Sequence, residues 1–123
     1  MPYPTEYSSA SAEFDRFLDA VKANAMLQTR HQAWQVARAV FLVFRGHLSA
    51  DEALRFADAL PPLLRAMFVE GLSAGQASRP FGDPAMLLRA VAAIRPDHNF
   101  IDESSIAAVS AALRAACDAQ RLA

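Results

Sequence analysis

Cysteine and glycine are scarce in this sequence, and their scarcity excludes several kinds of site. Cys117 is the only cysteine, so the chain forms no internal disulfide and no cluster of thiolates around a metal. A lone cysteine fits a reducing cytoplasm. The four glycines leave little material for a loop that cradles phosphate, and the GxGxxG, P-loop and GxSxG motifs are missing. We therefore expect no bound cofactor.

The sequence also lacks a large excess of charge of one sign and lacks long apolar runs. The net charge is −1, and acidic and basic residues are interspersed, which disfavours binding to nucleic acid or to an anionic membrane. The longest dense apolar run, 39–44, is far shorter than the roughly 20 residues that span a membrane. The N-terminus has no basic stretch followed by an apolar run, so it does not resemble a secretory signal. We expect a soluble, cytoplasmic protein.

Alanine is abundant instead, and it favours helices. The chain has 27 alanines among 123 residues, and 54% of its residues are hydrophobic, a composition typical of a folded helical protein. A domain of this length buries roughly two thirds of the surface that its unfolded chain exposes. Stability therefore requires neither a metal nor a disulfide.

Two stretches of the sequence recur. The pattern at 17–21 returns 70 positions later at 87–91, and 29–40 matches 102–113 with an offset of 73. The sequence therefore predicts an all-α fold, a compact bundle of about six helices built from two related helical repeats, of which the second is shorter. We expect a mobile lead-in at 1–10 and a single helical domain at 11–123, which comprises repeat one (11–70), a linker loop (71–83) and repeat two (83–123).

Apolar residues at helical spacing predict which side of each long helix is buried. The aromatic side chains fall at the same spacing, so we expect Trp34 and most of the phenylalanines in the core. The expected buried residues are Phe14, Phe17, Leu18, Val21 and Ala25 in the first helix, Ala33, Val36, Ala37, Val40 and Phe44 in the second, Leu87, Ala90, Val91 and Ile94 in the fifth, and Ile106, Val109, Leu113 and Cys117 in the last.

Capping patterns and prolines predict where helices begin and end. The spacing at 29–32 and at 49–52 is that of a capping box, with a hydroxyl residue three positions before Gln or Glu. Gly46 is placed to end the second helix in a left-handed conformation. The prolines at 61–62 end the third helix and start a fourth, and a sixth helix begins near Asp102.

Two loops contain the residues that we assign as candidates for binding a ligand or a partner. Arg79 and Phe81 combine a cation and an aromatic ring in the linker loop, and Asp97, His98 and Asn99 form a polar cluster in the next loop. Each has a structural alternative, since Phe81 can pack into the core and the polar cluster can bond its own backbone in a turn.

The histidines do not form a metal site within the chain. His31 and His47 lie on one helical segment, about 24 Å apart along its axis and on different sides. The sequence also lacks HxxxH and HExxH spacing. We assign no metal ligand and no catalytic residue.

Several motifs together resemble the bacterial domain-of-unknown-function family 2267. They are FDRFL at 14–18, TRHQAW at 29–34, ARAV at 37–40, LSADEA at 48–53, Leu60-Pro61, RPFGD at 79–83 and DHNF at 97–100. The likeness covers nearly the whole chain. It implies an all-helical fold of two related halves, and it implies no activity.

Members of that family often continue past the last helix with a further short helix and a Leu-Pro element, whereas this sequence stops at Ala123. One side of the last two helices would then lack cover. Ala108, Ala111, Ala112 and Ala115 are small enough to let another helix approach closely. The sequence therefore predicts a homodimer through the last helix.

The leading hypothesis for function is a non-enzymatic bacterial helical module that binds a protein partner or a second copy of itself. Capping boxes, proline stops and apolar stripes explain most of the distinctive residues without catalysis. The alternative is a small-ligand-binding protein with a pocket near the inter-repeat loop. A DNA-binding regulator is a third hypothesis, which the nearly neutral charge disfavours.

Overall fold

The computed structural model describes residues 4–75, 89–90 and 105–122 of the chain, and within these ranges the protein is helical without strands. The all-α prediction is confirmed. The helices are α1 (Thr5–Ser8), α2 (Ala10–Asn24), α3 (Arg30–Arg45), α4 (Ala50–Asp58), α5 (Pro62–Val69) and α7 (Ser105–Leu122). None of the helices in the described ranges has the length and apolar character needed to cross a membrane.

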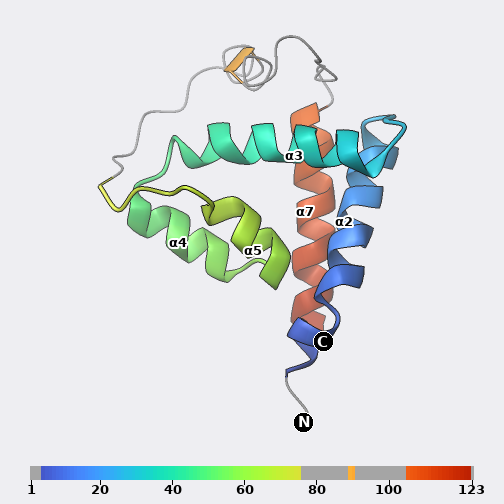
Figure 1. Cartoon of the computed structure of the whole chain (residues 1–123), viewed down its shortest axis with the longest axis horizontal. Coiled ribbons are helices and arrows are strands. Elements are labelled where there is room, and N and C mark those ends of the chain that lie inside the picture. Colours follow the sequence, from blue (N-terminus) through green and yellow to red (C-terminus); the bar gives the residue numbers. More distant parts are fainter. Residues whose placement is uncertain (1–3, 76–88, 91–104, 123) are drawn as a thin grey trace.

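The helices pack in two groups that α3 joins (Figure 1). Helices α2 and α7 lie side by side and run in opposite directions, and α3 crosses them near the C-terminal end of α2. The short helices α4 and α5 pack against each other, and α5 also contacts α2 and α3. The last helix, far away in sequence, therefore covers the first long one.

Buried side chains from five of these helices form one continuous core. Phe68 is central to it, since its ring lies 4.8 Å from Phe56, 5.5 Å from Phe41 and 6.3 Å from Phe44, measured between ring centroids. Pairs of aromatic rings at such distances add to the free energy gained by burial. The core residues are Phe17, Leu18, Val21, Ala33, Val36, Ala37, Ala39, Val40, Phe41, Ala53, Ala57, Leu60, Leu64, Phe68, Val109 and Ala112.

Both predicted capping boxes are confirmed. The hydroxyl of Thr29 accepts a hydrogen bond from the N–H of Gln32 at 3.0 Å, and Oε1 of Gln32 accepts one from the N–H of Thr29. At α4, the N–H of Ser49 donates to Oε1 of Glu52 at 2.8 Å, and the N–H of Glu52 donates to the hydroxyl of Ser49. Each box gives partners to helix N–H groups that have none inside the helix.

The capping box of α4 predicts a dependence of stability on pH. Hydrogen bonds from the backbone and side chain of Ser49 hold the pKa of Glu52 below its ordinary value. Because the folded-state pKa is lowered, this carboxylate stabilises the protein above its unfolded pKa, and the contribution is lost as the pH falls through the folded pKa. We expect the melting temperature of the wild type to fall more between about pH 5 and about pH 2 than that of Glu52→Gln.

Glutamine is a matched control, because it completes a capping box without titrating. Melting followed by circular dichroism at several pH values measures the difference. Parallel curves for the wild type and Glu52→Gln over this range would contradict the assignment.

Gly46 ends α3 as predicted, but the predicted left-handed conformation is wrong. Gly46 has φ −62° and ψ −18°, which is right-handed backbone. Its N–H bonds the carbonyls of Leu42 and Val43, and the next two N–H groups each reach back three residues. The helix therefore tightens in its last turn, because the chain has only a few residues in which to reach the cap of α4 at Ser49.

The left-handed turn occurs at the end of α2 instead. Met26 has φ +56° and is 90% exposed. Its N–H bonds the carbonyl of Ala23, and the N–H of Leu27 bonds the carbonyl of Lys22. These two bonds are those of a Schellman motif, in which glycine usually takes the position held here by Met26.

Replacing Met26 by glycine is expected to raise the free energy of unfolding by about 0.5–1 kcal/mol, since only glycine adopts this conformation without steric cost. Ala23→Gly is the matched control. It places glycine in the right-handed backbone of the same helix and is expected to destabilise the protein by about 1 kcal/mol. Urea unfolding measures both variants, and a loss of stability for Met26→Gly would refute the prediction.

The remaining boundary predictions have mixed outcomes. Pro62 occupies the first turn of α5, as expected. The lead-in predicted at 1–10 contains one helical turn, α1, and α2 begins at Ala10, one residue before the predicted start. Gly71, which follows α5, adopts left-handed backbone with φ 75°. The repeat stays a prediction, because most of its second unit before α7 lies outside the described residues.

Candidate functional site

The outer face of α3 carries polar and aromatic side chains that are not part of the buried core. His31, Trp34, Gln35 and Arg38 are spaced at i, i+3, i+4 and i+7, so they project from one side of the helix. His31 is exposed and the other three are half-buried. We call these four residues the Trp34 surface. The opposite side of α3 faces the core.

Contacts within the Trp34 surface hold the indole ring. The ring of His31 stacks on that of Trp34 with centroids 5.7 Å apart and an interplanar angle of 23°. The guanidinium carbon of Arg38 lies 5.9 Å from the centroid of the Trp34 ring, within the range of a cation–π interaction. Nε2 of Gln35 lies 3.0 Å from Nε2 of His31. Part of Trp34 packs against the core, so the ring is held by core contacts on its buried side and by His31 and Arg38 at the surface.

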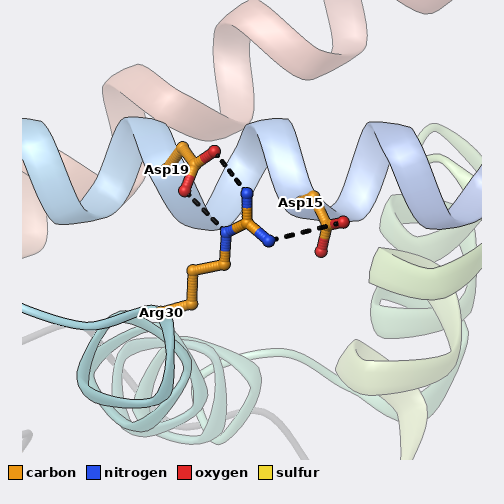
Figure 2. A network of polar contacts seen from close by, with 3 residues as sticks. All are labelled: Asp15, Asp19 and Arg30. Atoms are coloured by element: carbon orange, nitrogen blue, oxygen red, sulfur yellow. Dashed lines mark hydrogen bonds and ion pairs between the residues drawn. The ribbon is translucent and has the colours of Figure 1, made fainter.

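The first residue of α3, Arg30, is paired with two carboxylates of α2. Arg30 donates to both carboxylate oxygens of Asp19, at 2.8 and 3.0 Å, and its third nitrogen lies 3.6 Å from Asp15 (Figure 2). The hydrogen bond from Arg30 holds the pKa of Asp19 below its ordinary value. These side chains are about half exposed, so water screens the attraction. The network links α3 to α2 and gives the Arg30 guanidinium two carboxylate partners.

Two further arginines bind the ends of neighbouring helices. Arg45 donates to the carbonyls of Phe68 and Glu70, at 3.0 and 2.6 Å. Arg65 donates to the carbonyl of Leu60 at 2.9 Å and to that of Ala57 at 3.3 Å. The last carbonyls of a helix have no partner within it and carry partial negative charge, so a cation there is stabilising. These arginines therefore have structural roles.

The five residues assigned from the sequence as ligand- or partner-binding candidates are not tested. Arg79, Phe81, Asp97, His98 and Asn99 all lie outside the described residues. Their role in binding a ligand or a partner stays a hypothesis.

The four alanines assigned to a dimer interface do not share one open face. Ala108 and Ala112 are 4% and 2% exposed, because this side of α7 packs against α2 and α3. Ala111 and Ala115 are exposed. Among these four alanines, Ala111 and Ala115 are therefore the two that are open to a second copy of the chain, and the homodimer itself stays a prediction.

The described part of the chain holds no group of three His, Cys, Asp or Glu side chains placed to bind a metal ion. Glu52 is engaged in its capping box. Cys117 is partly buried against the core, on the side of α7 that the apolar pattern predicts.

The Trp34 surface is the feature that the sequence-based interpretation missed. Trp34 was expected in the core with the other aromatic residues, whereas it is only partly buried. The spacing of His31, Trp34 and Arg38 was a usable signal, because residues three and four apart meet on a helix. What the spacing alone does not give is which side of α3 the neighbouring helices cover.

Comparison with known proteins gives a family and no activity. None of the curated proteins matches the chain. A family model described as an uncharacterized conserved protein (DUF2267) matches residues 14–123, which include every helix described above except α1 and the start of α2. The chain therefore belongs to the DUF2267 family of uncharacterized conserved proteins.

Proposed function

We propose that this chain is a non-enzymatic helical module that binds another protein through the Trp34 surface. The observation that carries the proposal is the partly exposed ring of Trp34, held in contact with His31 and Arg38. Tryptophan and arginine are among the residue types that contribute most to binding at protein interfaces. A side chain that is already ordered loses less conformational entropy on binding.

The roles of the other polar residues support a module without catalysis. Thr29 and Ser49 cap helices, Arg45 and Arg65 bind helix ends, and Arg30 pairs with carboxylates of α2. Each of these groups is accounted for by folding. The setting that fits the proposal is a bacterial cytoplasm, since the sequence has one cysteine and resembles a bacterial family.

The proposal is tested by retention of proteins from a bacterial lysate on the immobilised full chain. We expect at least one protein that the wild type retains and Trp34→Ala loses. Leu54→Ala is the matched control, because Leu54 is a large apolar residue, 50% exposed, on a different helix. This variant is expected to retain the same protein as the wild type.

A second variant separates loss of the surface from loss of the fold. His31 is exposed, so His31→Ala removes the stack on Trp34 without opening the core, and it is expected to weaken retention while the helical circular dichroism stays unchanged. Equal retention by the wild type, Trp34→Ala and His31→Ala would overturn the proposal. Retention of nucleic acid alone would overturn it as well.

A further inference from the structure

The three arginines of α3 are not equivalent, because Arg38 differs from the other two in its contacts with the described residues. The helix sequence RHQAWQVARAVFLVFR contains three arginines and a histidine but no aspartate or glutamate. Arg30 is bound by Asp15 and Asp19, and Arg45 donates to carbonyls at the end of α5. Among the described residues, Arg38 contacts no carboxylate and is held over Trp34.

The surroundings of Arg38 favour a carboxylate over other anions. A guanidinium presents its donors in a planar fork that matches a carboxylate, and it retains these donors while it stacks on an aromatic ring. Phosphate-rich polymers require several cations for useful affinity, whereas the chain has a net charge of −1 and the Trp34 surface has one arginine. An apolar side chain beside the carboxylate would cover the exposed part of the indole ring.

We propose that the Trp34 surface binds an acidic segment of its protein partner, with a carboxylate on the Arg38 guanidinium and an adjacent apolar side chain on the Trp34 ring. This inference rests on the proposed function and names the chemistry of the partner. Binding is therefore specific for Asp or Glu next to an apolar residue, and it weakens as salt screens the ion pair.

A random peptide library displayed on phage and selected on the immobilised full chain tests the inference. Peptides retained by both the wild type and Leu54→Ala are expected to carry Asp or Glu beside an apolar residue. The affinity of a selected synthetic peptide is then measured through the fluorescence anisotropy of a dye attached to the peptide, because the variant Trp34→Ala lacks the only tryptophan of the chain. Arg38→Gln is expected to lower the affinity for this peptide about tenfold or more, since a charge-assisted hydrogen bond is lost.

Four outcomes separate the inference from the proposed function. Selected peptides that depend on Trp34 but lack acidic residues, or that bind Arg38→Gln as tightly as the wild type, overturn the inference and leave the proposed function standing. A single-stranded DNA oligonucleotide that displaces the peptide at lower concentration than free acidic peptide also overturns the inference. Peptides that bind Trp34→Ala as tightly as the wild type, with both proteins folded by circular dichroism, overturn the proposed function too.

Discussion

Replacing Phe68 by alanine is expected to lower the free energy of unfolding by about 3–5 kcal/mol. Phe68 is 1% exposed, and its ring contacts aromatic rings from α3 and α4. Removing it takes away the burial of a large side chain and leaves a cavity where α3, α4 and α5 meet. A domain of this kind has a total stability of about 5–15 kcal/mol, so the variant loses a large share of it.

Urea unfolding followed by circular dichroism measures the loss, with two variants as controls. Leu63 is on the same helix but 39% exposed, so Leu63→Ala is expected to cost far less than Phe68→Ala. Phe68→Leu keeps most of the apolar volume and is expected to cost about 1 kcal/mol, which gives a measurable value if Phe68→Ala does not fold. A cost below about 1 kcal/mol for Phe68→Ala would contradict the central place of this ring.

Local signals in the sequence were sufficient for most helix boundaries. The capping boxes at Thr29 and Ser49 and the proline at the start of α5 depend on residues within one helical turn, and each is found as predicted. The ends of α2 and α3 were harder. Gly46 is permissive but not forced into left-handed backbone, whereas Met26 adopts it because the hydrogen bonds that end α2 require it.

The burial and the contacts of a side chain depend on which helices pack together, and the periodicity of the sequence alone does not predict them. The apolar stripe of α3 correctly places Val36 and Ala37 in the core. Trp34 follows the same spacing, yet it lies at the edge of the stripe and remains partly exposed. The structural roles of Arg45 and Arg65 depend on carbonyls of other helices, so the sequence around each arginine does not predict these contacts.

The second large effect on stability is expected for a substitution on the buried side of α7. Ala112 is 2% exposed and belongs to the core, whereas its neighbour Ala111 is exposed. Ala112→Glu places a carboxylate among apolar side chains and is expected to lower the free energy of unfolding by about 3–5 kcal/mol, the range for an uncompensated buried charge. Ala111→Glu is a matched control, because it introduces the same residue, with good helix propensity, one position away, and we expect a change within about 0.5 kcal/mol.

The same two variants also test whether one face of α7 is buried within the chain and whether its open face forms a dimer interface. Burial raises the pKa of a carboxyl, so the destabilisation by Ala112→Glu should shrink as the pH falls and the carboxyl is protonated. Light scattering at micromolar concentration tests the predicted homodimer in parallel. If a dimer forms through the face of α7 that remains open, Ala111→Glu separates it into monomers without unfolding them. A wild-type mass equal to one chain would overturn the homodimer prediction, and equal destabilisation by the two variants would contradict the placement of α7 against α2 and α3.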